Sequence, residues 1–277
     1  MIDGRTKLIA HIGDPTETFK SPMIYNPYFE ARKINAVVVP LGCKSEDYAP
    51  FLKLLFRLTN ILGALITMPH KVTTLALVDQ ASVSARIAGA CNAVKMDEHG
   101  QLIGDMFDGE GFVRGLQRKG RLIAGVSAFI AGCGGVGSAI AASLAKAGVS
   151  RLGLYDVSAT AMDALTQRLK SHYPNLEAVA GSADPAGYDI VVNATPLGMK
   201  KDDPFPMKLE RISPSTFVGE VVMSEEMTPF LTAVRAKGCE VQVGTDMLFE
   251  QIPAYLEFLG LGTATPDELR KLAQIHY

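Results

Sequence analysis

The chain alternates between short apolar runs and stretches with helical periodicity. Predicted strands cover residues 7–13, 35–42 and 62–68, and predicted helices cover residues 21–34 and 47–60. Ser21-Pro22 is a suitable helix start, because a proline at the first helical position sacrifices no hydrogen bond. This alternation of strands and helices is typical of an α/β fold with a parallel sheet covered by helices.

The pattern restarts in the middle of the chain. Residues 91–105 predict a hairpin that turns at His99-Gly100, and residues 109–119 predict a helix. A second series of strands follows, at residues 126–132, 150–156, 176–181, 188–195, 215–222 and 239–244. The restart near Asp108 predicts two α/β lobes.

Composition and charge indicate which kind of molecule the protein binds. The 277 residues are 48% hydrophobic and 20% charged, and 27 basic against 29 acidic residues leave a formal charge of -2. Such a balance favours neither nucleic acid nor an anionic membrane, so we expect a small-molecule partner. No apolar stretch has the length of a signal peptide or of a membrane helix, and a cytoplasmic location is expected.

Cysteines and histidines give no sign of a metal site. The four cysteines lack metal-ligand spacing, and we expect them to be small buried hydrophobes. The histidines are dispersed, and we expect structural roles for them, with His70 the one that merits a test. They are His11, His70, His99, His172 and His276. We therefore expect no metal.

A glycine motif follows the strand at residues 126–132. Gly132-x-Gly134-x-x-Gly137, with Gly135 and Val136 completing the turn, lies directly between this strand and a helical stretch. In that context the motif is a dinucleotide-binding fingerprint, because the glycines permit a tight turn and close approach to a pyrophosphate at the helix N-terminus. The alternative is a tight strand-to-helix turn without a ligand.

Asp156 ends the next strand, a little beyond the usual spacing from the first glycine. A carboxylate there can accept the ribose hydroxyls of an adenosine and would repel the extra phosphate of NADP. NAD is therefore expected in preference to NADP. The alternative is that Asp156 only caps the helix that starts near Ser158.

The segment "ITMPHK" places Lys71 just after a buried strand, and Asp105 and Asp108 precede the helix at 109–119. A lysine oriented by a carboxylate can take the proton of an alcohol while a nicotinamide takes the hydride. The alternative is an ordinary solvated lysine.

These pieces together resemble the shikimate dehydrogenase family along nearly the whole chain. The similar motifs, in order, are "GDPTETFKSP", "ITMPHK", "AGACNAV", "GDMFDGEGF", "GCGGVG", "NATPLG" and "GTDMLFEQ". The resemblance implies a substrate-binding catalytic domain, residues 1–107 completed by 240–277, and an NAD-binding Rossmann domain, residues 108–239. It also implies a cyclic hydroxy acid as substrate. We expect the protein to be a monomer or a homodimer.

The resemblance assigns roles to individual residues. Lys71 and Asp108 match the catalytic pair. The positions expected to contact substrate are Ser21, Thr67, Asn92 and Gln251, and those expected near the cofactor are Ala194, Thr195, Val221 and Gly244.

Departures from the family pattern fall on the substrate side. Phe19 replaces a serine that would grip a carboxylate, Met223 replaces a tyrosine, and Leu65 replaces an asparagine. Each change removes a hydrogen bond, typically worth about 0.5–1.5 kcal/mol, so a divergent branch acting on a shikimate relative is expected. The "YDVS" stretch also lacks the asparagine-arginine-threonine sequence of NADP-using members, which again favours NAD.

The resulting hypothesis is an oxidoreductase that reversibly oxidises a ring hydroxyl of shikimate, quinate or aminoshikimate. A non-catalytic NAD-binding regulator of the same fold is the alternative. A folate-linked dehydrogenase of related architecture fits the serine-proline and late glutamine motifs less well.

Overall fold

The computed structural model describes residues 2–275, within which the chain divides into two compact units. The first unit contains the residues up to Phe107 and those from Ile252 onward, and the second contains Asp108–Gln251. None of the helices within residues 2–275 is long and apolar enough to cross a membrane. His276, for which a structural role is expected, lies outside the described residues.

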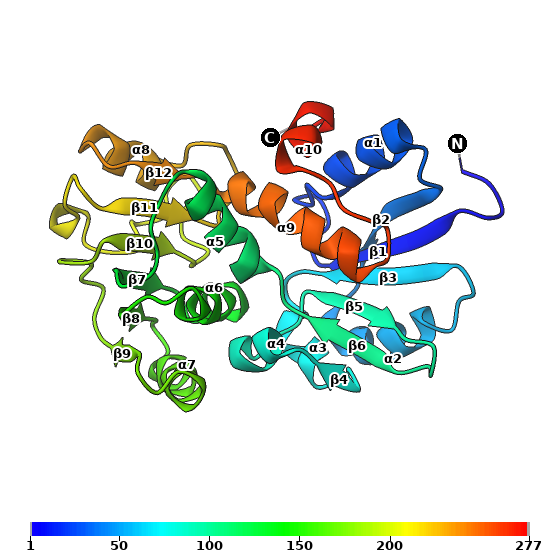
Figure 1. The fold of residues 1–277 in the computed structure, drawn as a ribbon, viewed down its shortest axis with the longest axis horizontal. Helices are drawn as coiled ribbons and strands as arrows, with labels where there is room; N and C mark the ends of the chain where they lie inside the picture. The colour runs from blue at the N-terminus through cyan, green and yellow to red at the C-terminus, as the bar shows by residue number, and fades with distance from the viewer. Residues whose placement is uncertain (1, 276–277) are drawn as a thin grey trace. The chain divides into compact units, whose positions relative to one another are not determined.

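The first unit is built on a mixed six-stranded sheet, ordered β2-β1-β3-β5-β6-β4. Its strands are β1 (Lys7–Gly13), β2 (Ala36–Gly42), β3 (Ile61–Ile66), β4 (Gln80–Ala81), β5 (Ala93–Met96) and β6 (Leu102–Asp105). β1 runs parallel to β2 and β3, whereas β5 runs antiparallel to β3 and β6 (Figure 1). The predicted hairpin is β5–β6, and it makes this sheet mixed where a parallel one was expected.

The helices of the first unit are α1 (Pro22–Arg32), α2 (Ser45–Leu55), α3 (Lys71–Leu75), α4 (Val83–Ala88), the end of α9 (Gly244–Phe258), and α10 (Pro266–Leu272). α1 packs on β2, and α10 packs on α1. Tyr48 and Leu52 of α2 form one buried cluster with Ala10 and Ile12 of β1. Because successive side chains of a strand point to opposite faces, His11 lies on the face away from α2.

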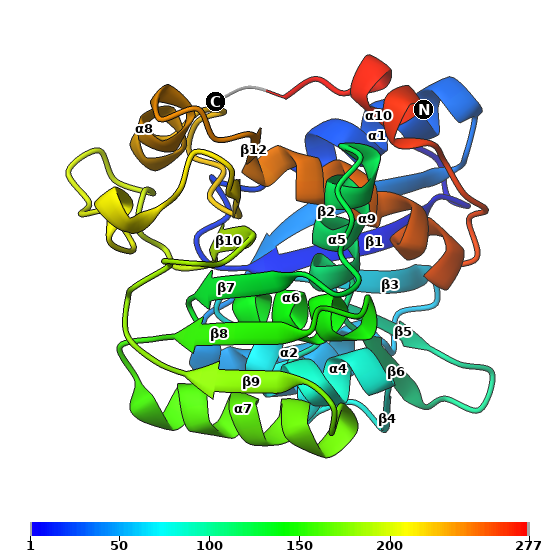
Figure 2. The ribbon, with the colours of Figure 1, turned by 60° about the vertical axis from the view of Figure 1, so that its left-hand side comes forward.

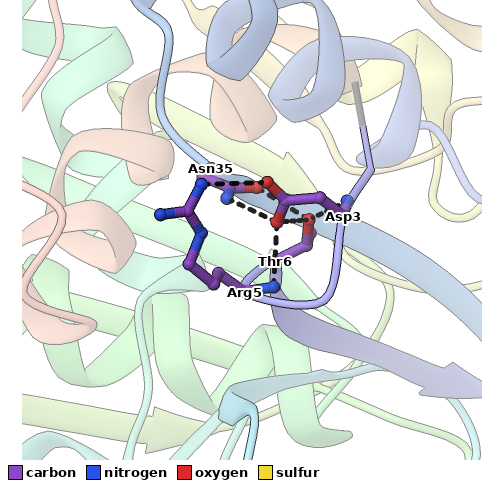
Figure 3. Close-up of polar contacts among 4 residues, drawn as sticks. All are labelled: Asp3, Arg5, Thr6 and Asn35. Carbon is purple, nitrogen blue, oxygen red and sulfur yellow. Dashed lines mark hydrogen bonds and ion pairs between the residues drawn. The ribbon is translucent and has the colours of Figure 1, made fainter.

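A hydrogen-bonded turn fixes the start of β1 against β2 (Figure 3). The Asp3 carboxylate accepts from the Arg5 N–H at 2.8 Å and from Asn35 Nδ2 at 3.1 Å. Thr6 Oγ1 donates to Asn35 Oδ1 at 2.7 Å. These contacts fix the register that carries β1 to Gly13 at its carboxyl end, where the candidate site begins.

The second unit holds a fully parallel sheet, ordered β12-β11-β10-β7-β8-β9. Its elements are α5 (Asp108–Arg118), β7 (Ser127–Ala131), α6 (Gly135–Lys146), β8 (Arg151–Tyr155), α7 (Ala159–His172), β9 (Glu177–Ala180), β10 (Ile190–Asn193), a 3-10 turn (Leu209–Arg211), β11 (Phe217–Glu220), α8 (Pro229–Ala236), β12 (Val241–Gln242) and the start of α9. This is the strand order of doubly wound dinucleotide-binding folds. β7 and β10 are neighbours, and Figure 2 shows β7, β8 and β9 in sequence across the sheet.

The second unit extends further along the chain than the boundary expected at residue 239. β12 pairs with β11 in the parallel sheet, and α9 starts within this unit at Gly244. The chain returns to the first unit only at Ile252, within α9. The pairing of β12 with β11, which the local composition does not reveal, places residues 241–242 in the second unit.

Candidate active site

Thr67, Lys71 and Asn92 meet at one edge of the first sheet. Thr67 follows β3 and Asn92 precedes β5, and since these strands are antiparallel, the two residues lie at the same edge. The Ile66 N–H donates to the Asn92 carbonyl at 2.7 Å, and the Cys91 N–H donates to the Lys71 carbonyl at 2.9 Å. The strand ends therefore hold the three backbones together.

His70 anchors the turn that carries Lys71. Its ring is buried, stacks on Tyr48 with centroids 4.0 Å apart, and its Nε2 lies 2.8 Å from the Cys43 carbonyl. Thr74 Oγ1 donates to the His70 carbonyl at 2.8 Å and lies 2.6 Å from Tyr48 Oη. Burial lowers the pKa of His70. His70 thus fixes the start of α3, where Lys71 is the first residue.

Asn92 has one polar atom without a partner. Its N–H donates to the Asp105 carbonyl at 2.9 Å, its Oδ1 accepts from the Phe107 N–H at 2.9 Å, and its carbonyl accepts from Tyr255 Oη at 3.0 Å. The side chain is 1% exposed, yet Nδ2 has no partner among the described residues. A buried amide fixed in this way presents a donor that a ligand oxygen could satisfy.

Phe19 and Ser21 border the end of β1. A Cβ added to Gly13 would lie 2.4 Å from Thr67 Cγ2 and 2.9 Å from Phe19 Cζ, so only glycine fits there. Ser21 is buried at the start of α1, and its hydroxyl makes no capping bond to that helix. The structure therefore brings Phe19 beside Thr67 and leaves the Ser21 hydroxyl available for another partner.

His11 of β1 belongs to the same neighbourhood. Its ring stacks on Phe19, with centroids 4.0 Å apart and an interplanar angle of 26°. Burial, aided by the charge of Lys71, lowers the pKa of His11 to about 3. A neutral imidazole is therefore present near Lys71 at neutral pH.

Asp108 and Gln251 belong to the second unit. Asp108 is the first residue of α5 and is buried. Gln251 of α9 is also buried, packs on Gly111, and has an Oε1 without a partner in the part of the chain that is described. Lys71 and Asp108 fall in different units, and their pairing remains a prediction.

The glycine motif has the geometry of a cradle. Gly132 has a φ of +99°, a conformation that favours glycine, and a Cβ there would lie 2.6 Å from the Ala194 carbonyl oxygen. A Cβ on Gly137 would lie 1.8 Å from the Gly132 carbonyl oxygen, whereas Gly134 has open space around it. Gly135 and Val136 begin α6 and are partly exposed. The open helix N-terminus fits a dinucleotide pyrophosphate.

Ala194 and Thr195 reach this cradle because β10 lies beside β7. Asn193, fully buried at the end of β10, shapes them: its Oδ1 accepts from Thr195 Oγ1 at 2.7 Å and its Nδ2 donates to the Leu197 carbonyl at 3.0 Å. The same Nδ2 donates to Glu220 Oε2 at 3.0 Å. Burial raises the pKa of Glu220, which is fully buried at the end of β11.

Val221, Met223 and Gly244 continue the same edge. The Val221 N–H donates to the Asn193 carbonyl at 3.2 Å. A Cβ on Gly244 would lie 2.1 Å from the Val222 carbonyl oxygen and 3.1 Å from Met223 Cγ. The residues predicted near the cofactor thus form a contiguous series along the carboxyl edge of the second sheet.

The sequence did not predict a place in the candidate site for three polar residues at the strand ends of the two sheets. They are His11, for which only a structural role was expected, Asn193 and Glu220. Each is a buried polar residue on or at the end of an apolar strand. A polar side chain in such a position needs a partner, and this was the available signal.

Solved structures of similar fold cover nearly the whole chain. Shikimate 5-dehydrogenase from Listeria monocytogenes, solved in complex with shikimate and NAD, has a TM-score of 0.88 and 25% identity over 98% of this chain and 97% of its own. The ligand-free 5-ketofructose reductase of Gluconobacter has a TM-score of 0.86 and 26% identity over 98% of both chains. The predicted two-lobed α/β fold with a substrate domain and a Rossmann-type domain is confirmed.

The expected preference for NAD is wrong. The relatives from Rubrobacter xylanophilus and Acidiphilium cryptum, among others, are named shikimate dehydrogenase (NADP(+)). In the structure the Asp156 carboxylate accepts from the Cys133 N–H at 2.7 Å and from the Ser158 N–H at 2.8 Å. Asp156 therefore supports the start of α7, as the capping alternative predicted, and also the glycine turn, which was not predicted.

Family membership follows from sequence similarity. The family model for the shikimate dehydrogenase substrate binding domain matches residues 11–94. The Rubrobacter relative is 36% identical over 90% of this chain and 89% of its own, and the Acidiphilium relative is 32% identical over 97% and 96%. These relatives are enzymes and give no support to a non-catalytic regulator. The chain belongs to the shikimate dehydrogenase family of NAD(P)-dependent oxidoreductases.

Proposed function

We propose that the protein catalyses the reversible, NADP-linked oxidation of a ring hydroxyl of shikimate or a close relative such as quinate or aminoshikimate. The observation that carries the proposal is the buried donor Asn92 Nδ2, which has no partner among residues 2–275, on a residue whose backbone is held close to those of Thr67 and Lys71. A hydroxylated ligand bound there would satisfy this donor and bring one of its hydroxyls to the lysine.

Lys71 takes the proton of the reacting hydroxyl during oxidation and returns it during reduction, and the family resemblance assigns Asp108 as its catalytic partner. Anchoring of the α3 start by His70 supports this role, because a base must be held within hydrogen-bond reach of the proton that it transfers. Ser21, Thr67 and Gln251 supply further polar contacts to the substrate.

The glycine turn holds the cofactor. Gly132, Gly134 and Gly137 admit the pyrophosphate at the N-terminus of α6, and Ala194 and Thr195 line the adjoining strand end. NADP supplies the hydride acceptor when it is bound. Val221, Met223 and Gly244 lie further along the same edge and border the nicotinamide end of the site.

Phe19 and Met223 depart from the family pattern on the substrate side. The substrate can therefore be any of several ring acids or related polyols. The similar fold of a 5-ketofructose reductase favours testing a keto-sugar beside them. The test is formation of NADPH by purified protein with shikimate, quinate or aminoshikimate, and oxidation of NADPH with 5-ketofructose. Turnover of a ring acid supports the proposal. Exclusive turnover of 5-ketofructose, or no turnover from neutral to alkaline pH, contradicts it.

A further inference from the structure

The His11 imidazole is buried with one ring nitrogen unpaired. The residue is 7% exposed, and its Nδ1 has no hydrogen-bond partner among residues 2–275. A buried polar group that lacks a partner costs about 1–3 kcal/mol, which native structures tolerate mainly where another molecule supplies the partner. His11 Nδ1 therefore needs a partner that the described part of the chain does not provide.

His70 shows what a structural histidine looks like in the same unit. It too is buried and stacked on an aromatic ring at 4.0 Å, but its Nε2 lies 2.8 Å from the Cys43 carbonyl. His11 has the same kind of stacking, on Phe19, and lacks the protein acceptor. The two residues therefore differ in the hydrogen bond between a ring nitrogen and the protein. That bond gives His70 a structural role, and its absence leaves His11 Nδ1 for a ligand.

The stacked pair of His11 and Phe19 itself suits an uncharged ligand group. Phe19 covers one face of the ring, and the imidazole is neutral at neutral pH. A neutral imidazole offers one donor and one acceptor, which matches a hydroxyl. A carboxylate against this pair would lose water without gaining a charged partner from it, which is costly.

We propose that His11 is a substrate-recognition residue that hydrogen-bonds a hydroxyl of the substrate other than the one oxidised, with Phe19 holding the imidazole in place. This inference rests on the proposed function, since it assigns a role within the same substrate site. It makes His11 and Phe19 a specificity pair for a neutral part of the ring, with the substrate carboxylate lying elsewhere.

The experiment compares His11→Phe with the matched variant His70→Phe, using shikimate, NADP and the purified enzyme. His11→Phe keeps an aromatic ring against Phe19, so the melting temperature should stay within about two degrees of wild type or rise. The kcat/KM for shikimate should fall about 10-fold to 100-fold, with His11→Gln recovering part of the loss. His70→Phe should lower the melting temperature, because it breaks a protein hydrogen bond.

Substrate analogues identify the group that His11 recognises. The probes are shikimate amide and the two analogues that each lack one of the ring hydroxyls not oxidised in the reaction. With one deoxy analogue, wild type and His11→Phe should have the same kcat/KM, because the recognised hydroxyl is gone. Equal values with the amide alone would place the carboxylate at His11 and overturn the inference.

Two further outcomes are decisive. If the wild-type protein turns over shikimate and His11→Phe does so equally well, or loses melting temperature as His70→Phe does with unchanged kinetics, His11 is structural and only this inference fails. If the wild-type protein turns over no ring acid, the proposed function fails and this inference falls with it.

Discussion

Asn193 Nδ2 donates a hydrogen bond to the carboxylate of Glu220 over 3.0 Å, and both residues are fully buried. The bond links the ends of β10 and β11 beneath the predicted cofactor site. Because Glu220 Oε1 has no partner in the described part of the chain, the carboxylate is only partly satisfied.

Glu220→Gln should stabilise the protein at neutral pH. Burial raises the pKa of Glu220 above 4.5, because the folded state disfavours the ionised carboxylate. The protein therefore loses stability as the pH rises above the pKa that Glu220 has in the unfolded state. The glutamine oxygen can still accept from Asn193. The melting temperature should rise by about 2–4 °C at pH 7, and the gain should vanish as the pH falls to about 4.5. Exposed Glu226→Gln is the control, and a lower melting temperature for Glu220→Gln at pH 7 would contradict the account.

Asn193→Ala should weaken cofactor binding more than substrate binding. The change removes the bonds that shape Thr195 and Leu197 and one of the hydrogen bonds to Glu220. KM for NADP should rise about tenfold or more, with a smaller change in KM for shikimate. Equal increases in both constants would show that Asn193 supports the whole fold and not the cofactor edge.

Wild-type protein should lose stability on acidification through His11. Its pKa falls from 6.5 to about 3 on folding, so below pH 6.5 the unfolded state gains a proton that the folded state lacks. The loss is about 1.4 kcal/mol for each pH unit between these values. His11→Phe should flatten the fall in melting temperature between pH 6.5 and 3, whereas exposed His172→Phe should follow wild type. Parallel curves for wild type and His11→Phe would mean that His11 is already protonated in the fold.

Two glycine variants separate folding from cofactor binding. Gly137→Ala places a Cβ 1.8 Å from the Gly132 carbonyl oxygen, and we expect unfolding or a large loss of melting temperature. Gly134→Ala meets no atom within 4 Å and has a φ of -70°, so it should fold normally and bind NADP at least tenfold more weakly. Thermal melting checks the stability of both variants, and calorimetric titration checks the NADP affinity of Gly134→Ala. An unchanged NADP affinity in Gly134→Ala would place the pyrophosphate elsewhere.

Local patterns predicted most of the secondary structure but few of the contacts. The apolar run at residues 7–13 coincides with β1, and the hairpin after Asn92 is β5–β6. β4, α3 and α4 were not predicted, because elements of two to six residues carry too little periodicity.

The gathering of the cofactor-side residues depends on strand order. Gly132 meets Ala194 because β7 pairs with β10, a non-local pairing that no spacing in the sequence encodes. The NAD preference argued from Asp156 was wrong for a related reason. A carboxylate at a strand end can bind a ribose or the neighbouring backbone, and only the structure shows that it accepts from the Cys133 and Ser158 N–H groups.

The central claim is that Lys71 transfers the proton of the reacting hydroxyl, and the most direct measurement is kcat of Lys71→Ala beside its NADP affinity. We predict that kcat with the preferred ring acid falls about 10²-fold to 10⁴-fold while the Kd for NADP and the melting temperature stay near wild type. Exposed Lys53→Ala, in the same unit, should leave all three unchanged. A Lys71→Ala variant that keeps more than half of the wild-type kcat would contradict the account.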